Sequence, residues 1–169
     1  MADIPRLNGI IKQLEEGKTA VTTFAQPEPN VAVGLATSGY DGVIFEMEHN
    51  PFETKGLRDT LQYMLNRGQI VGGGSLAPQV TPIVRIPPNG SEKNQFLAKQ
   101  VLDVGVYGVV WPHVSTAEEA YNAVSASRYP RPTDREYREP RGQRGDAPVT
   151  AARYWGISQQ DYYKKADVW

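Results

Sequence analysis

The sequence predicts an α/β fold in which parallel strands are covered by helices. Short apolar segments rich in Val and Ile alternate along the chain with longer segments whose apolar residues recur at helical spacing. The strand-like segments are apolar throughout rather than alternating with polar residues, which is typical of strands buried on both faces. With 169 residues, the chain is long enough for one domain with its own hydrophobic core.

The first half of the chain begins with an amphipathic helical segment. Leu7, Ile10, Ile11 and Leu14 form its apolar face, and Gly17 supplies a stop. The same criteria apply to the segments that follow, the last of which is a Gly-rich connector. We expect helices at 4–18, 29–38 and 52–68, strands at 19–25 and 41–47, and the connector at 69–80.

The second half repeats this order. Ser91 is a possible N-cap of the next helix, Ser115 and Glu118 have the spacing of a capping box, and Ser158 is a cap for the last helix. A polar loop rich in Arg and Pro interrupts the alternation, and long ordered loops are often functional. We expect strands at 81–86 and 107–111, helices at 89–105, 115–124, 150–156 and 158–169, and the loop at 128–148.

Composition excludes several classes of protein. The formal net charge is −1 and most basic residues are scattered, which argues against a nucleic-acid or acidic-membrane partner. There is no cysteine, so neither a disulfide nor a thiolate metal site is available. No apolar run approaches the roughly 20 residues that span a bilayer, and the first residues lack the apolar core of a signal peptide. We therefore expect a cytoplasmic protein.

Each predicted strand ends in unusual polar or aromatic residues. In parallel α/β folds the carboxyl ends of the strands share one face, and ligands bind there. We therefore expect these residues to gather on that face: Phe24 and Gln26, Glu46 to His49, Arg85, and Trp111 with His113.

The segment GVIFEMEHNPF at 42–52 carries the densest group of them. Period-two alternation places Glu46 and Glu48 on the same side of the strand, opposite Met47. His49 is either satisfied by a backbone carbonyl at the strand end or acts as a general base oriented by nearby carboxylates.

Arg85 lies between apolar neighbours in IVRIPP, and a buried charge needs an anionic partner. A structural carboxylate and an anionic substrate fit this requirement equally well. The pairing of Glu46 and Glu48 modestly favours a role for both as substrate or metal-water contacts. His113 has only its position after a strand to favour it as such a contact.

Several segments in order resemble the HpcH/HpaI aldolase family, the metal-dependent class II pyruvate aldolases. These segments are EMEHNPFE, PIVRIPP, KQVLDVGVYGVVWPHVSTAEEA, SRYP and GQRG, and the resemblance runs from about Leu7 to Trp169. Within the family, VYGVVWPHVSTAEEA and RGDAPVTAARYWG are most similar to macrophomate synthase and its fungal relatives.

The resemblance implies a (β/α)₈ barrel in which a divalent ion, magnesium, manganese or cobalt, holds a pyruvate enolate. It implies that His49 is the catalytic base, that Arg85 stabilises the enolate oxygen, and that Asp103 raises the basicity of the histidine. Asp103 falls at the end of a helix that runs against the strands, on the face opposite His49. We therefore expect a homo-oligomer in which the site is completed between subunits.

Two departures from the family pattern stand out. Glu46 occupies a position where many members have aspartate, which moves its carboxylate by one methylene. The family's two metal ligands lie beyond Trp169, so residues 1–169 are expected to form a partial domain with about four of eight βα units and no metal ligand of their own.

The leading expectation is a carbon–carbon lyase that acts on 2-oxo acids through a pyruvate enolate, by aldol or retro-aldol reaction or by oxaloacetate decarboxylation. One alternative is a truncated or degenerate half-barrel without activity, which acts as an oligomerising or interaction fragment. Another is that the chain is part of a longer gene product. Recruitment of Glu46, Glu48 or His113 as new metal ligands is a further alternative.

Overall fold

The computed structural model describes residues 6–131 and 139–166. Its centre is a sheet of four parallel strands in the order β1-β2-β3-β4, so that each strand pairs with the next one along the chain. Parallel neighbours of this kind require helical crossovers, which agrees with the predicted α/β class. The strands are β1 (Thr22–Ala25), β2 (Gly42–Glu46), β3 (Thr81–Arg85) and β4 (Val109–Val110).

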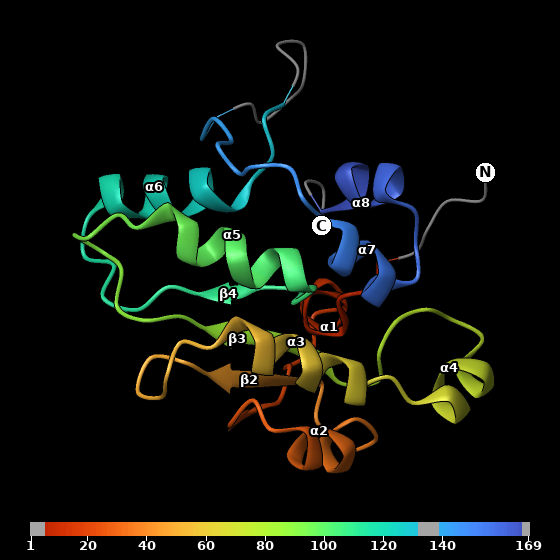
Figure 1. Ribbon diagram of the computed structural model, residues 1–169. Helices are drawn as coiled ribbons and strands as arrows, with labels where there is room; N and C mark the ends of the chain where they lie inside the picture. Colours follow the sequence, from red (N-terminus) through yellow and green to blue (C-terminus); the bar gives the residue numbers. More distant parts are fainter. Residues whose placement is uncertain (1–5, 132–138, 167–169) are drawn as a thin grey trace.

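The helices lie mainly on one face of this sheet (Figure 1). Four of them pack side by side in the order α2, α3, α5, α6, and α7 joins α5 and α8. They are α1 (Gly9–Glu15), α2 (Pro29–Leu35), α3 (Thr54–Tyr63), α4 (Arg67–Gly73), α5 (Gln95–Val104), α6 (Ala117–Ser127), α7 (Val149–Trp155) and α8 (Gln159–Lys165). None of the helices within these ranges is long and apolar enough to span a membrane.

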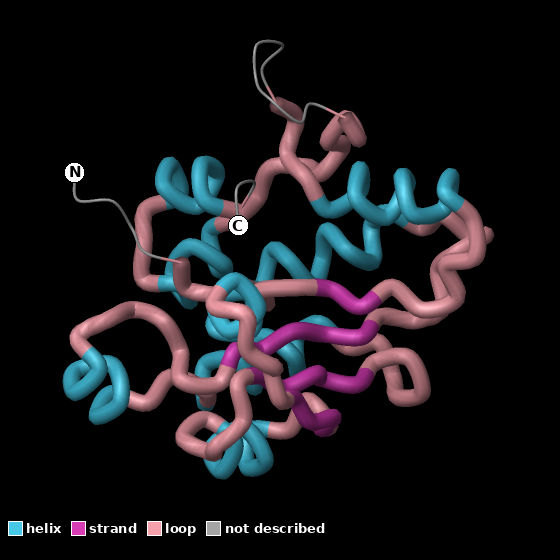
Figure 2. The backbone as a smooth tube through the Cα atoms, turned by 180° about the vertical axis from the view of Figure 1, so that it is seen from behind, coloured by secondary structure: helices cyan, strands magenta, loops and turns pink. Residues whose placement is uncertain are grey.

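The two faces of the sheet have different environments. Val43, Phe45 and Val84 point toward the helices and are fully buried. Ile44 and Ile83, which pair with each other across β2 and β3, point the other way and are only half-buried. We call this second side of the sheet the inner face; Figure 2 shows it in front of the helical layer.

Helix α1 covers the end of the inner face where the strands begin. The Ile10 side chain fills the space that a Cβ at Gly42 would occupy, so a larger residue at this strand start would have to displace Ile10. The backbone N–H of Gly9 donates to Thr81 Oγ1 at 2.9 Å, and Asn8 Nδ2 donates to the Tyr107 carbonyl at 3.2 Å. The inner face therefore stays open mainly along its side and at the carboxyl ends of the strands.

Helices α7 and α8 pack over the far end of α5. Trp155 stacks on Tyr107 with ring centroids 4.3 Å apart, and its indole N–H donates to the Gly105 carbonyl at 2.8 Å. Tyr162 is buried beside Trp155 and donates its hydroxyl to the Leu102 carbonyl at 3.2 Å. These aromatic contacts tie the two helices to the end of α5 and to the segment that precedes β4.

The predicted element order is confirmed, and the differences are local. The connector at 69–80 was expected to lack structure, but α4 occupies part of it. Asn66 caps this helix by accepting from the Gln69 N–H, and Gly74 ends it in the left-handed conformation. This helix is short and rich in glycine, so it lacks the apolar spacing by which a helix is recognised in the sequence.

Two predicted helix caps are wrong. Helix α5 begins after Asn94 rather than after Ser91, and α6 has its capping box at Thr116 and Glu119, one residue beyond Ser115 and Glu118. The Ser158 cap is confirmed. Parts of the predicted polar loop and of the last helix, 132–138 and 167–169, lie outside the described residues.

Candidate functional site

Three charged side chains meet at the carboxyl ends of β2 and β3. The strand register places Glu46 beside Arg85. Arg85 Nε donates to Glu46 Oε2 at 2.7 Å, its Nη2 contacts the same oxygen, and its Nη1 lies 2.9 Å from Glu48 Oε2. Side-chain exposure is 26% for Arg85, 13% for Glu46 and 4% for Glu48, so the carboxylates are more deeply buried than the cation. One guanidinium therefore compensates two carboxylates.

Glu46 also shapes the chain that follows β2. Its Oε1 accepts from the backbone N–H groups of Glu48 at 2.6 Å and His49 at 3.1 Å, and Asn50 Nδ2 donates to its carbonyl at 3.2 Å. Burial alone would raise the pKa of Glu46, but the hydrogen bonds from Arg85, His49 and Glu48 outweigh it and hold the pKa below its ordinary value. Glu46 is thus held as a carboxylate.

Both histidines of the chain lie beside Glu48. His113 Nε2 is 3.3 Å from Glu48 Oε1, and His49 Nε2 is 3.7 Å from Glu48 Oε2. Both imidazoles are largely exposed, at 69% and 73%. We call Arg85, Glu46, Glu48, His49 and His113 the Arg85 cluster.

The backbone at His113 is unusual. Its φ of 62° lies in the left-handed region, which is uncommon for a residue other than glycine. The carbonyl of His113 packs so closely on Gly90 that any Cβ at position 90 would overlap it, and the Asn89 N–H donates to the Pro112 carbonyl at 3.4 Å. These two contacts fix the position of the loop after β4 against the loop after β3. Strand position alone indicated His113, and its contact with Glu48 was not foreseen.

Phe24, at the end of β1, contacts the cluster from the side. The guanidinium carbon of Arg85 lies 4.8 Å from the centre of its ring, a cation–π distance. The Phe24 side chain is nonetheless 54% exposed. Its place at the end of a strand was predicted from the sequence, but its stacking on Arg85 was not.

Asp103 lies elsewhere. Helix α5 runs against the strands, so its last turn lies at the end where the strands begin, beside α7 (Figure 1). Asp103 Oδ1 accepts from Arg144 Nη2 at 2.9 Å. Burial raises the pKa of Asp103, and the ion pair with Arg144 offsets only part of that effect, so the pKa stays above its ordinary value. The structure does not bring Asp103 to His49 within one chain, and its catalytic role stays a prediction.

Arg144 is the most buried cation of the described residues. Its side chain is 2% exposed, and its guanidinium carbon lies 4.4 Å from the ring centre of Tyr129 and 5.4 Å from that of Tyr162. Its Nη2 also donates to the Tyr162 hydroxyl at 3.2 Å. We call Arg144, Asp103, Tyr129 and Tyr162 the Arg144 cluster. Sequence reasoning missed it, because Arg144 stands in a polar loop.

The residues of the Arg85 cluster do not by themselves fit a metal ion. No group of three or more His, Cys, Asp or Glu side chains in the described ranges is arranged to hold one. The two carboxylates that would be the natural oxygen ligands are already engaged by Arg85. The divalent ion that the family resemblance implies therefore has no ligand set among these residues.

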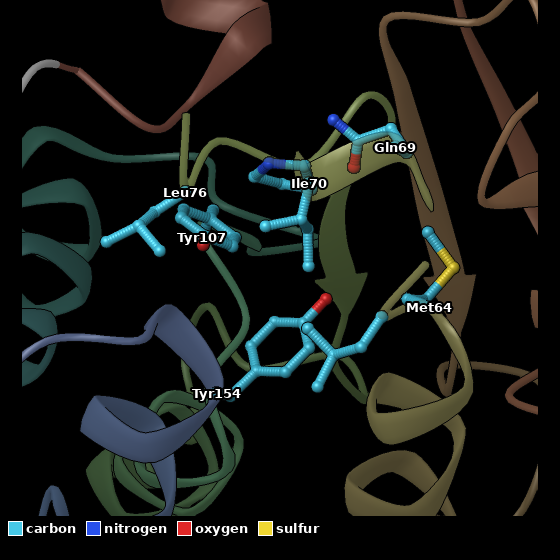
Figure 3. A pocket seen from close by; sticks show the side chains of 8 residues that line it. Met64, Gln69, Ile70, Leu76, Tyr107 and Tyr154 are labelled. Atoms are coloured by element: carbon cyan, nitrogen blue, oxygen red, sulfur yellow. The ribbon is translucent and has the colours of Figure 1, made fainter. Parts of the chain in front are cut away.

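A small pocket lies apart from the cluster, between α4 and α7 (Figure 3). The hydroxyl of Tyr154 points into it and is buried without a partner. The enclosed space has room for about one water molecule, which would satisfy this hydroxyl. The lining residues are Met64, Leu65, Gln69, Ile70, Leu76, Pro78, Tyr107 and Tyr154.

Comparison with known proteins places this geometry in a family. Residues 24–152 match the model of the HpcH/HpaI aldolase/citrate lyase family. The chain is 34% identical over 146 residues to 2-keto-3-deoxy-L-rhamnonate aldolase of Salmonella gallinarum and 37% identical over 145 residues to that of Salmonella paratyphi B. Each match covers 85% of this chain but 45% of the relative. The chain thus spans about half the length of the curated relatives it matches.

The matches to solved structures also cover about half of the other chain. A HpcH/HpaI aldolase/citrate lyase family protein from Burkholderia cenocepacia has a TM-score of 0.72 and 26% identity, over 95% of this chain and 56% of the other. Macrophomate synthase has a TM-score of 0.58 and 25% identity, over 84% of this chain and 41% of the other. The sequence motifs indicated a particular likeness to macrophomate synthase, and the comparisons do not support it, since the Burkholderia structure matches with the higher TM-score and the rhamnonate aldolases are 34% and 37% identical. The four-stranded fold matches about half of a barrel aldolase chain, and this protein belongs to the HpcH/HpaI aldolase/citrate lyase family.

Proposed function

We propose that this chain supplies the anion-binding and proton-transfer groups of a lyase that makes or breaks a carbon–carbon bond next to a 2-oxo acid. The observation that carries the proposal is the Arg85 cluster, in which a permanent cation, two carboxylates and an exposed imidazole meet at the carboxyl ends of two parallel strands. Family membership supports the reaction class.

Arg85 is the group that would receive the substrate. Its guanidinium is partly exposed, and an enolate or carboxylate oxygen that arrives there competes with the two glutamates for its N–H donors. A developing enolate oxygen carries more negative charge than the parent ketone, so the guanidinium stabilises the enolate more strongly. This difference favours enolate formation.

His49 is the group that would move the proton. Its imidazole is 73% exposed, so a substrate can reach Nε2, and Glu48 at 3.7 Å stabilises the imidazolium once the proton has transferred. Retro-aldol cleavage, aldol addition and oxaloacetate decarboxylation all pass through the same pyruvate enolate. Capture of that enolate by an unsaturated partner, as the macrophomate-synthase-like motifs suggest, starts from the same intermediate.

Two further parts of the proposal, a divalent ion and a second subunit, are not contained in one chain. The divalent ion, magnesium, manganese or cobalt, is implied by family resemblance, and we assign no step to it because the Arg85 cluster offers it no ligand set. Asp103 can reach a His49 only from another subunit, since it lies at the opposite end of its own sheet. We therefore include a homo-oligomer in the proposal.

The test is oxaloacetate decarboxylation by the purified chain, with and without magnesium or cobalt, corrected for the rate of the free ion. His49→Ala should lower turnover by about 10²- to 10⁴-fold, the usual contribution of a general base. Lys55→Ala, an exposed change in the first turn of α3, is the matched control and should leave turnover unchanged. Equal turnover of the His49 variant and the parent would contradict the role of His49.

A second candidate function is a half-barrel without catalytic activity that acts through its interactions. The observation that favours it is the saturation of Arg85 by two carboxylates. Absence of turnover with every ion tested would mean either this candidate or that the chemistry needs the strands that the relatives have beyond the matched half.

A further inference from the structure

Arg85 lies between the two imidazoles in the order of the strands. His49 follows β2, Arg85 ends β3 and His113 follows β4, and β3 pairs with both of its neighbours. An anion held by the guanidinium therefore has an imidazole on the strand at either side. The proposed function uses His49 and leaves His113 without a role.

The position of His113 is fixed by its surroundings. Its backbone is left-handed, with a φ of 62°, and its carbonyl oxygen lies against Gly90. This conformation is uncommon for a residue with a side chain, and it persists where the neighbouring contacts impose it. The loops after β3 and β4 thus hold the imidazole beside Glu48.

Glu48 orients both imidazoles at once. Its side chain is 4% exposed, its Oε1 lies 3.3 Å from His113 Nε2, and its Oε2 lies 3.7 Å from His49 Nε2. A buried carboxylate stabilises an imidazolium beside it. Because Glu48 faces Nε2 of His113, the second ring nitrogen, Nδ1, is the one left to exchange a proton with a substrate.

We propose that His113 is a second catalytic residue, which exchanges a proton with the oxygen of the aldehyde half of the substrate while His49 serves the enolate carbon. The inference rests on the proposed lyase function. In the addition direction, His49 takes a proton from the methyl carbon of pyruvate, and the electron pair of that C–H bond forms the enolate. The enolate carbon then bonds to the aldehyde carbon, and the aldehyde oxygen takes the proton of the His113 imidazolium. Cleavage is the reverse of these steps.

This division of roles keeps the charge of the Arg85 cluster constant. Before the addition His113 carries the proton, and afterwards His49 carries it, so Glu48 faces one imidazolium at both stages. A site with a single imidazole would instead gain or lose a charge beside two largely buried carboxylates. Oxaloacetate decarboxylation involves no aldehyde oxygen and therefore depends less on His113.

Two matched variants test the role of His113. His113→Gly removes the imidazole. Lys93→Gly is the control, because Lys93 is the other non-glycine residue of the described ranges with a left-handed backbone, at a φ of 53°, and lies in the loop after β3. Glycine adopts these values of φ without strain, so both backbones can keep their conformation. The ion pair of Lys93 with Glu118 is exposed and contributes little.

Binding of 2-oxopentanoate and of 4-hydroxy-2-oxopentanoate, measured by calorimetry without added divalent ion, isolates the contact with the oxygen. The parent chain and Lys93→Gly should bind the hydroxylated compound about two- to tenfold more tightly, the contribution of one hydrogen bond. His113→Gly should bind the two compounds equally. A parent chain that binds neither compound contradicts the anion site of the proposed function, and this inference with it. Equal binding of both compounds by the parent contradicts the role of His113 alone.

Release of pyruvate with magnesium or cobalt tests the proton transfer itself. His113→Gly should lower kcat for cleavage of 4-hydroxy-2-oxopentanoate by about 10²- to 10⁴-fold and kcat for oxaloacetate decarboxylation by less than about tenfold. Lys93→Gly should retain both rates. Equal losses in the two reactions, or a loss confined to KM, would overturn the proposal for His113 and leave the lyase function standing. A parent chain that binds both compounds but releases pyruvate from neither substrate would contradict catalysis by this chain, and the role of His113 in it.

Discussion

The Arg85 cluster and the Arg144 cluster use the same chemical groups in opposite ways. Each has an arginine that pairs with carboxylate and stacks on an aromatic ring. Arg85 is partly open to solvent and shared by two carboxylates, whereas Arg144 is buried between two tyrosines and has a single carboxylate. Solvent access therefore distinguishes the two arginines, since one is accessible from solvent and the other is enclosed by the fold.

The largest difference between the two clusters should appear in the free energy of unfolding. Arg144→Met removes the cation from a buried pair and leaves Asp103 partly buried without its partner, so we expect a loss of about 3 kcal/mol in the free energy of unfolding. Urea unfolding measures it. Arg85→Met is the matched comparison and should cost less, because Glu46 keeps its two backbone N–H donors and Glu48 keeps the two neighbouring imidazoles. Equal losses for the two variants would remove the distinction between the clusters.

Anion binding should depend more on the Arg85 cluster than on the Arg144 cluster, the reverse of the order expected for stability. Oxalate is a planar anion that resembles an enolate of pyruvate, and calorimetry measures its binding to the chain. Arg85→Gln should weaken binding about 10- to 100-fold, which corresponds to one charged hydrogen bond of roughly 1.5–3 kcal/mol. Arg153→Gln, a change at an arginine on α7 away from the Arg85 cluster, serves as the control and should bind as the parent does. If Arg85→Gln binds oxalate as the parent does, an anion does not displace Glu46 and Glu48 from Arg85.

The two clusters should respond to pH with opposite signs. The pKa of Glu46 is below its ordinary value in the folded state, so its contribution to stability is present above the unfolded pKa and is lost as the pH falls through the folded one. The pKa of Asp103 is above its ordinary value, so its contribution is present below the unfolded pKa and is lost as the pH rises through the folded one.

Unfolding free energies of Glu46→Gln and Asp103→Asn across the acidic range test this contrast. The stability advantage of the parent over Glu46→Gln should shrink as the pH falls. The stability of the parent relative to Asp103→Asn should instead improve on acidification. Parallel changes in the two variants would contradict the assigned directions.

The smallest effect is expected at Phe24. An exposed cation–π contact is worth about 0.5–1 kcal/mol, so Phe24→Leu should weaken oxalate binding by only about two- to fivefold. Calorimetry under the conditions used for Arg85→Gln gives the comparison. A loss as large as that of Arg85→Gln would mean that Phe24 does more than support the guanidinium.

Much of the Arg85 cluster could be predicted because it follows from strand periodicity. Glu46 and Glu48 alternate with buried Met47, and Arg85 ends the adjacent strand, so parallel pairing alone brings the three charges together. The element order followed from apolar spacing in the same way. These are local rules that a single sequence contains.

The Arg144 cluster could not be predicted because its parts are distant in the sequence. Arg144 follows a polar loop, and only the packing of α8 beside α5 brings Tyr162 over its guanidinium. The partner of Asp103 was missed for the same reason. Helix α4 was missed because its glycines conceal the periodicity that the other helices display.

The contact between Gly90 and the left-handed backbone of His113 constrains how this protein can be re-engineered. The loops after β3 and β4 are interlocked there, so a graft that replaces one of them alone would displace the imidazole from Glu48. Residue 90 must remain glycine for the interlock to close. The two loops should therefore be exchanged together, and chimeras with related proteins should have their junctions outside both.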